Sequence, residues 1–332
     1  MIEQGQFMPR FRSDVYPFIH PAKFRGSLQG KVAILTGSAG AIGQGLAESF
    51  AVAGAKLILT YNNTPPPEGF EYRCMGLGAA GVSMIKCNVS KLESCQQLIQ
   101  QVLGENSGRV DVLINNAGAN GLGPMDAQNP EDFMYDMSVN FDGPYFLMRL
   151  LLPVFRAQKS GCVLNIASRA GTVAIPYSTS YCASKAALIN LTGCVQKEMD
   201  VEGLEDIHLY SLHPGGIKSA MTLKKYGEES VANLPEKARG WFSNTLDFYN
   251  DSPYLNGMVC VALATGIAKD VLRGKYIDVG QDLEDVLEQK EHLKQNPNLY
   301  ALHTSFLGGL PNGGIPPGGY QVPEKPFEFP GY

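Results

Sequence analysis

The stretch "KVAILTGSAGAIGQGLAESF", residues 31–50, joins an apolar strand pattern to a helix pattern through a glycine-rich turn. Glycines at such a turn permit tight backbone conformations, and the free N–H groups at the start of the following helix attract phosphate. A glycine pattern alone is weak support, but its place after the first strand of a β–α–β unit favours a dinucleotide site over a merely tight turn. Ala41 replaces the middle glycine of the pattern Thr-Gly-x-x-x-Gly-x-Gly, and Gly40 precedes it, so the loop can still fit a phosphate.

The alternation of short apolar strands and helical patterns continues along the chain. Further strands are expected over 56–61, 82–89, 110–118, 161–168, 207–215 and 276–280, and helices over 41–55, 92–106, 133–155 and around Tyr181. Near-continuous Val, Ile and Leu strands separated by helices indicate an α/β fold with a parallel sheet covered on both faces. Such sheets bind ligands at the carboxyl ends of their strands.

Composition narrows the class of protein. The 332 residues are 44% hydrophobic and 18% charged, with a net charge of -5, which gives no reason to expect nucleic acid or an anionic membrane as a partner. Seven cysteines without a CxxC pair, several inside apolar runs, indicate reduced core residues of an intracellular protein. The five histidines lack metal-ligand spacing, so no metal is expected. No apolar signal segment or membrane-length run is present, so we expect a soluble, cytoplasmic protein.

The end of the second strand bears on cofactor choice. An acid there hydrogen-bonds the ribose of NAD and would repel the extra phosphate of NADP. Residues 59–67 read "LTYNNTPPP", without Asp or Glu before Glu68. Thr60, Tyr61, Asn62 and Asn63 can donate hydrogen bonds to a phosphate, so NADP(H) is favoured over NAD(H).

The helix pattern "SYCASKAALINLTGCV", residues 180–195, carries Lys185 as its only charge. Lys185 and Tyr181 are four residues apart and share one helix face. A buried ammonium beside a phenol should lower the pKa of the phenol towards neutrality and make Tyr181 a general acid and base. The non-catalytic alternative is a helix tyrosine beside a lysine that extends its ammonium to solvent. The pattern Tyr-x-x-x-Lys alone does not exclude this alternative.

Further motifs follow in a fixed order. They are "TGSAGAIG" (36–43), "NNAG" (115–118), Asn140 in "SVNFDG" (138–143), Ser168 placed 13 residues before Tyr181, "YCASK" (181–185) and "HPGGIKS" (213–219). Over roughly residues 30–283 the chain resembles the compact branch of the short-chain dehydrogenase/reductase family. The resemblance implies a single doubly wound domain of the Rossmann type over 30–283.

The resemblance also implies a role for each site residue. The implied catalytic residues are Asn140, Ser168, Tyr181 and Lys185. Lys185 would bind the nicotinamide ribose and lower the pKa of Tyr181, Tyr181 would exchange a proton with the substrate oxygen, and Ser168 would orient that oxygen. Asn140 would hold a water behind Lys185; the alternative is a polar helix residue satisfied locally. The implied cofactor-binding residues are Gly37, Ser38, Ile42, Gly43, Tyr61, Asn62, Asn88, Val89, Asn116, Tyr181, Lys185, Pro214, Gly215, Ile217 and Ser219, with Asn88 standing where the family more often has Asp.

The function implied is an NADP-dependent oxidoreductase that moves a hydride between the cofactor and a carbonyl or secondary alcohol. An isomerase or dehydratase of the same fold and a non-catalytic NADP-binding regulator are the alternatives. An intact set of four catalytic residues argues against the regulator. The family's usual assemblies imply a homodimer or homotetramer.

Three segments complete the prediction. A substrate lid is expected over about 218–252, where Trp241, Phe242, Phe248 and Tyr249 suit an apolar or aromatic substrate, or equally core or subunit contacts. Tyr177 and Met221 are pocket candidates by position. Residues 1–29 form an aromatic, basic N-terminal extension, and 284–332 a helix followed by a Pro/Gly/aromatic arm expected to roof the active site or brace a subunit interface.

Overall fold

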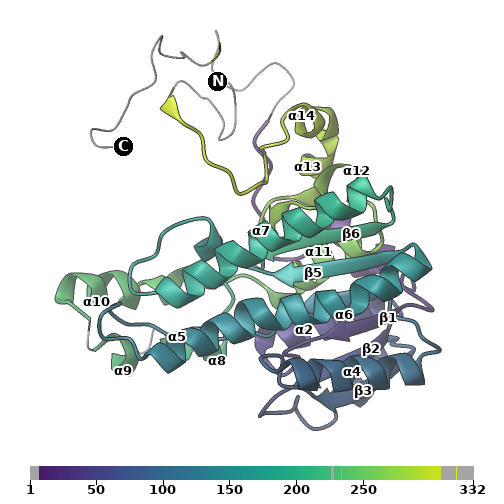
Figure 1. The fold of residues 1–332 in the computed structure, drawn as a ribbon, viewed down its shortest axis with the longest axis horizontal. Helices are drawn as coiled ribbons and strands as arrows, with labels where there is room; N and C mark the ends of the chain where they lie inside the picture. Colours follow the sequence, from purple (N-terminus) through teal and green to yellow (C-terminus); the bar gives the residue numbers. More distant parts are fainter. Residues whose placement is uncertain (1–6, 226–227, 233, 308–318, 320–332) are drawn as a thin grey trace, which may run out of the picture.

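The computed structural model describes residues 7–225, 228–232, 234–307 and 319, and one parallel sheet runs through its centre (Figure 1). The strand order is β3-β2-β1-β4-β5-β6-β7. The chain adds β2 and β3 on one side of β1 and then β4 to β7 on the other side, so the order of strands reverses between β1 and β4. The strands are β1 (Val32–Leu35), β2 (Lys56–Tyr61), β3 (Gly81–Lys86), β4 (Val112–Asn115), β5 (Gly161–Ile166), β6 (Ile207–His213) and β7 (Tyr276–Asp278). The doubly wound α/β fold expected from the sequence is confirmed.

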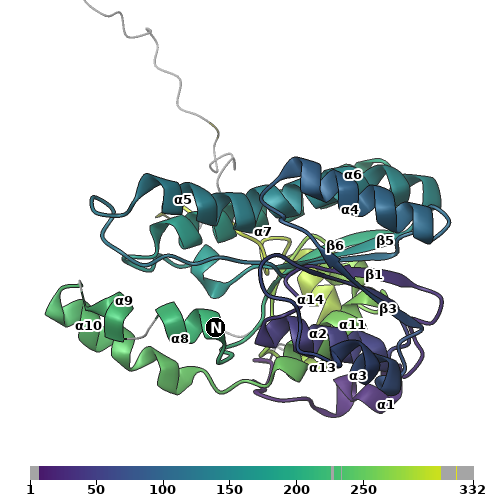
Figure 2. The ribbon, with the colours of Figure 1, turned by 90° about the horizontal axis from the view of Figure 1, so that it is seen from below.

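Helices cover both faces of the sheet (Figure 2). The helices α4 (Leu92–Glu105), α6 (Gly143–Gln158) and α7 (Thr179–Val201) lie on one face. The other face carries α2 (Ala41–Val52) and α11 (Pro253–Ala264), with α3 (Phe70–Leu77) beside α2. The remaining helices and helical turns are η1 (Pro17–Ile19), α1 (Pro21–Phe24), α5 (Pro130–Met137), η2 (Ser138–Asp142), η3 (Arg169–Gly171), α8 (Ala220–Lys225), α9 (Glu228–Val231), α10 (Glu236–Ser243), η4 (Thr245–Phe248), α12 (Lys269–Leu272), α13 (Leu283–Glu288) and α14 (Lys290–Gln295).

The apolar strands supply both halves of the core. Successive side chains of a strand point to opposite faces. In β1, Ala33 and Leu35 belong to the cluster under α2 and α11, whereas Val32 and Ile34 belong to the cluster under α4 and α6. All four are buried, which explains why the strand reads as a continuous apolar run rather than an alternating one.

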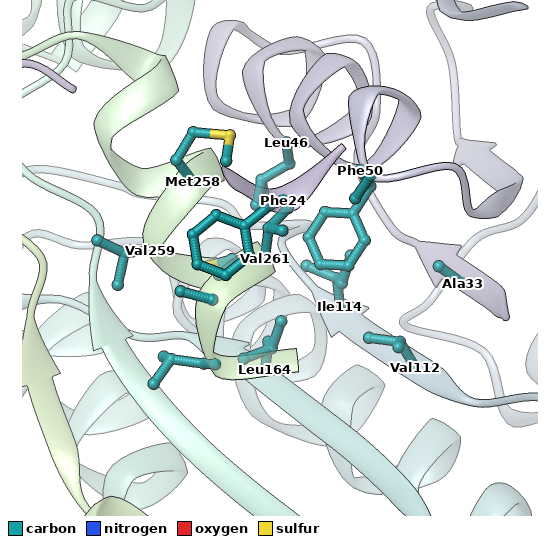
Figure 3. Close-up of a cluster of buried hydrophobic side chains, with 14 of the residues drawn as sticks. Phe24, Ala33, Leu46, Phe50, Val112, Ile114, Leu164, Met258, Val259 and Val261 are labelled. Atoms are coloured by element: carbon teal, nitrogen blue, oxygen red, sulfur yellow. The ribbon is translucent and has the colours of Figure 1, made fainter. Parts of the chain in front are cut away.

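Helices α2 and α11 approach each other closely. A Cβ atom on Gly257 would lie 2.1 Å from Ser49 Oγ, and one on Gly45 would lie 2.8 Å from Pro253 Cβ. Figure 3 shows Phe50 of α2 and Met258 of α11 in the apolar cluster that these helices share with the strands. This packing fixes α2, whose N-terminus follows the glycine-rich turn.

The helix expected over 133–155 is confirmed, since α5, η2 and α6 follow one another without a gap from Pro130 to Gln158. The middle part, η2, is a π-helical turn that contains Asn140. Such turns are uncommon and often occur at functional sites. The π-helical turn was not predicted from the sequence pattern.

The two flanks meet. Residues 7–16 run beside α13 and the end of β7, with Phe11 and Gln281 in an antiparallel bridge. The charged pattern after residue 281 forms two short helices, α13 and α14, and most of the expected arm beyond residue 307 lies outside the described residues. Within the described chain no helix has both the length and the apolar character needed to span a bilayer.

Candidate active site

A cavity of about 500 Å³ opens where β5, β6 and β7 end. Ser168 follows β5, Pro214 follows β6, and Asp278 ends β7, and all three line the cavity. Tyr181 enters from the first turns of α7. The cavity therefore lies at the carboxyl edge of the sheet, where doubly wound folds bind ligands.

Ser168 and Tyr181 come together in this cavity. The hydroxyl of Ser168 forms a hydrogen bond with the Tyr181 phenol. Ser168 is also the N-cap of η3, where its Oγ accepts a hydrogen bond from Ala170 N at 3.1 Å. The cap fixes the serine rotamer, so both hydroxyls face the same space.

Lys185 lies behind Tyr181 on the same face of α7. Its side chain is 4% exposed, and its Nζ lies 5.6 Å from the centre of the Tyr181 ring. The ammonium donates a hydrogen bond to the Ile166 carbonyl oxygen at 2.7 Å. Lys185 is therefore a buried lysine and not a snorkelling one.

The lowered pKa expected for Tyr181 is not present in this structure. Burial raises the pKa of Tyr181 to about 12, and the hydrogen bond from Ser168 acts in the opposite direction. Burial also lowers the pKa of Lys185 to about 8, because its ammonium has only a carbonyl oxygen to replace water. Burial is thus the first cause of both pKa shifts, whereas the sequence analysis considered only the attraction between the two groups.

Asn140 is fully buried in the π-helical turn. Its Nδ2 donates to the Ala119 carbonyl at 2.8 Å and to Ser184 Oγ at 3.1 Å, and its Oδ1 accepts from Ala119 N at 2.9 Å. Both amide hydrogens are therefore committed to protein acceptors, and Asn140 clamps the loop after β4 to α7, one residue from Lys185. That Asn140 also holds a water behind Lys185 stays a prediction.

The glycine-rich turn after β1 is packed tightly against its surroundings. Gly37 has φ +65°, and a Cβ there would lie 2.8 Å from Ala117 Cα. A Cβ on Gly43 would lie 2.3 Å from the Gly37 carbonyl oxygen. Ala41 occupies the first position of α2 without a positive φ, so a methyl group fits where the pattern usually has glycine.

The start of α2 can receive an anion. The N-cap, Gly40, contributes no side-chain hydrogen bond, so the amides of the first turn are left for a ligand. The turn and the cavity share Ile42, which lines the cavity from the α2 side. A pyrophosphate at α2 and a nicotinamide ring at the cavity would fit these residues, because α2 follows β1 at the reversal of strand order and its Ile42 also lines the cavity.

The comparisons with known proteins agree with this geometry. A family profile described as short chain dehydrogenase matches residues 31–230. The chain belongs to this family. It is therefore an NAD(P)-dependent oxidoreductase of the short-chain dehydrogenase/reductase type.

Relatives cover most of this short-chain dehydrogenase. A short chain dehydrogenase of Pseudocercospora fijiensis is 30% identical over 286 residues, which are 85% of this chain and 90% of that protein. An 11-beta-hydroxysteroid dehydrogenase-like 4A protein of Arabidopsis thaliana is 32% identical over 62% of this chain and 67% of its own length. A metagenomic short-chain oxidoreductase solved in complex with NADP has a TM-score of 0.58 and 26% identity, covering 72% of this chain and 92% of that one.

The other expected cofactor residues fall into two groups. Pro214, Gly215, Ile217 and Ser219 line the cavity beside Tyr181. The second group consists of residues whose side chains hold the turn and strands together: Ser38 bonds the Thr60 carbonyl, Asn116 bonds the Thr36 and Gly37 carbonyls, Asn88 Oδ1 accepts from Ser90, and Val89 packs in the core. Their side chains support the site through the backbone they position.

Tyr61 and Asn62 lie half-buried where β2 ends. Tyr61 is the register partner of Lys86, the last residue of β3. Partners in adjacent parallel strands present their side chains on the same face. Lys86 therefore accompanies Tyr61 at this strand end, a cation on the neighbouring strand that the sequence analysis did not consider.

Residues of the expected lid segment, 218–252, line the cavity, and its role as a lid stays a prediction. Figure 2 shows α8 to α10 projecting beyond the strand ends. Phe248, Tyr249 and Met221 line the cavity, whereas Phe242 is buried against Tyr177, with ring centroids 6.5 Å apart. The side chain of Trp241 lies outside the described part of the chain.

Several lining residues were missed by sequence reasoning. They are Phe11, Arg12, Ser13, Arg169, His213, Asp251 and Asp278. Arg169 Nη2 donates to Asp278 Oδ2 at 2.9 Å, and Asp251 Oδ2 accepts from Gly216 N at 2.6 Å. The lining is thus mixed rather than wholly apolar. Arg169 follows Ser168, His213 is the first residue of the motif HPGGIKS, and Asp251 falls in the expected lid, so these three were placed near the site but not assigned to it.

Proposed function

We propose that this protein is an NADP-dependent oxidoreductase for ketones and secondary alcohols that acts at the cavity after β5, β6 and β7. The observation that carries the proposal is the hydrogen bond between Ser168 and Tyr181 at the surface of this cavity. Two hydroxyls that converge on one point can both bind a single substrate oxygen. An alcohol or ketone oxygen fits this requirement.

The chemistry assigns one role to each residue. A bound reduced nicotinamide supplies the hydride that a carbonyl carbon accepts. Tyr181 donates its phenolic proton to the carbonyl oxygen, and Ser168 donates a hydrogen bond that orients that oxygen. Lys185 places a positive charge behind Tyr181, which favours the phenolate left after the transfer. In the oxidative direction Tyr181 accepts the proton.

The preference for NADP rests on the end of β2. No acid follows Tyr61 before Glu68, and Lys86 ends the neighbouring strand. A cation near the adenosine ribose would attract a phosphate, and nothing there would repel one. The solved metagenomic relative in complex with NADP supports the same choice.

The substrate we propose carries an apolar or aromatic group beside its carbonyl. Ile175, Phe248 and Tyr249 provide apolar surface in the cavity. The Arabidopsis relative is named for a hydroxysteroid, which is an apolar secondary alcohol. The protein is proposed to act as a homodimer or homotetramer, which sedimentation would show.

The test is direct. Purified protein is supplied with NADPH or NADH and a panel of aliphatic and aromatic ketones, and cofactor oxidation is followed. Ketone-dependent oxidation of NADPH, faster than that of NADH, is expected. Binding of cofactor without turnover of any ketone, or clear preference for NADH, would contradict the proposal.

A further inference from the structure

The N-terminal strap, which we define as residues 7–16, forms one wall of the active-site cavity. Phe11, Arg12 and Ser13 line the same cavity as Ser168 and Tyr181. The strap lies outside residues 31–230, where the family profile matches. Among the described residues, none after Gly280 lines the cavity. Of the two chain flanks, the N-terminal strap therefore forms part of the cavity wall, and the described residues after Gly280 do not.

One side of the strap is held by two buried carboxylates. Asp282 and Asp285 are 0% and 4% exposed. Arg10 forms two side-chain hydrogen bonds with Asp285, at 2.9 and 2.6 Å, and Arg12 Nε donates to Asp282 at 2.9 Å. A buried carboxylate without its cation is costly. The pairing therefore holds the strap on α13 whenever the domain is folded.

Main-chain bonds hold the strap along its length. The Ser13 carbonyl accepts from Ser252 N at 2.8 Å, at the start of α11, and the Tyr16 hydroxyl accepts from Leu283 N at 2.7 Å. These partners lie more than 200 residues away in sequence. The strap thus joins α11 to α13 and is positioned from both.

Only one strap side chain is left with a large exposed apolar surface at the cavity. Arg12 is committed to Asp282, and its guanidinium lies over the Tyr16 ring at 5.3 Å. Phe11 is 62% exposed, and its Cδ1 would lie 3.7 Å from a Cβ on Gly280, the second residue after β7. An aromatic ring held at the cavity by rigid backbone suits contact with an apolar group of a ligand.

We propose that Phe11 is a specificity-determining residue that packs against the apolar, non-reacting group of the substrate. The inference rests on the proposed function for the reacting group, which Ser168 and Tyr181 bind. The substrate class is narrowed to ketones and secondary alcohols with a ring or chain that reaches from the carbonyl to the strap.

The test compares Phe11→Ala with Phe7→Ala in the full chain. Phe7 is a matched control, because it is also an exposed phenylalanine of the strap but does not line the cavity. Selectivity is measured as the ratio of kcat/KM for propiophenone to that for acetone. Removing an apolar contact is expected to lower this ratio roughly tenfold in Phe11→Ala, and Phe7→Ala should retain the wild-type ratio.

A second measurement does not require turnover. Binding of propiophenone to the protein without cofactor is measured by calorimetry, and Phe11→Ala should bind roughly tenfold more weakly than wild type or Phe7→Ala. Binding with the expected difference but without reduction would sink the proposed function and leave the strap inference standing. Equal binding by all three proteins, or no binding by wild type, would overturn the strap inference. If the ketones are nevertheless reduced, the proposed function stands.

Discussion

The Lys185 ammonium lies 2.7 Å from the main-chain carbonyl oxygen of Ile166, at the end of β5. This hydrogen bond joins the helix that carries Tyr181 to the strand that precedes Ser168. It replaces only part of the water that the ammonium loses on burial, which is why the pKa of Lys185 falls to about 8. Burial of Lys185 is therefore a cost to the stability of the cofactor-free protein.

That cost predicts a pH dependence. Between about pH 8 and 10.5 the unfolded chain holds the Lys185 proton more firmly than the folded chain, so wild-type stability rises with pH in this window. Lys185→Met lacks this contribution. The unfolding free energy of wild type minus that of Lys185→Met should rise by up to about 3 kcal/mol across the window.

Denaturant titrations at several pH values measure this difference. Lys197→Met, an exposed lysine of the same helix, is the control and should follow wild type at every pH. Parallel curves for wild type and Lys185→Met would show that burial does not perturb Lys185.

Asn140 should contribute more to stability than its neighbour Ser184. Asn140→Ala leaves the Ala119 N–H and carbonyl without their side-chain partner, and each unpaired buried group costs roughly 1–3 kcal/mol. We expect Asn140→Ala to lower the unfolding free energy by about 2–4 kcal/mol. Ser184→Ala removes one partner of Asn140 and should cost about 1 kcal/mol. Equal losses would contradict the clamp.

An added methyl group should have different effects on stability at two glycines of the turn, Gly43 and Gly40. Gly43→Ala would place a methyl group 2.3 Å from the Gly37 carbonyl oxygen and should lower the unfolding free energy by about 1–3 kcal/mol. Gly40→Ala is the control, since φ at Gly40 is -74° and the nearest atom to its added Cβ is 4.0 Å away. Cofactor-free protein is measured, so phosphate contacts do not enter. A stable Gly43→Ala protein would mean that the turn is looser than described.

Cofactor choice should respond to charge at the end of β2. Tyr61→Asp would place a carboxylate where the extra phosphate of NADP is expected, and should weaken NADPH binding tenfold or more relative to NADH. Tyr61→Asn removes the ring without adding charge and serves as the control. Fluorescence titrations with both cofactors give the affinities. An unchanged ratio in Tyr61→Asp would place the phosphate elsewhere.

The sequence predicted the parts of the fold that depend on local patterns. Strands occur at all seven expected positions, and α2, α4 and α7 at expected helix positions; β2 ends at its expected boundary, and the other six strands end one to three residues before theirs. Helix α11 was not predicted. It is buried on nearly every side, so it lacks the amphipathic period that marks a surface helix.

The remaining differences come from contacts between distant residues. The π-helical turn η2 was not predicted, and its Asn140 bonds Ala119 and Ser184, which lie 21 and 44 residues away in sequence. The strap has no periodicity of its own and is positioned by Asp282 and Asp285, 270 or more residues later in the chain. A pattern confined to a window of sequence cannot report such bonds. The reversed pKa of Tyr181 has the same origin, because burial depends on the whole packed site.

The most direct test of the account is the turnover of Tyr181→Phe with a ketone that wild type reduces. The substitution removes only the hydroxyl that meets Ser168 in the cavity. Turnover should fall by about 10²–10⁴-fold, the usual contribution of a general acid, while melting temperature and NADPH affinity stay near wild type. Turnover close to that of wild type would contradict the assignment of Tyr181 as the proton donor.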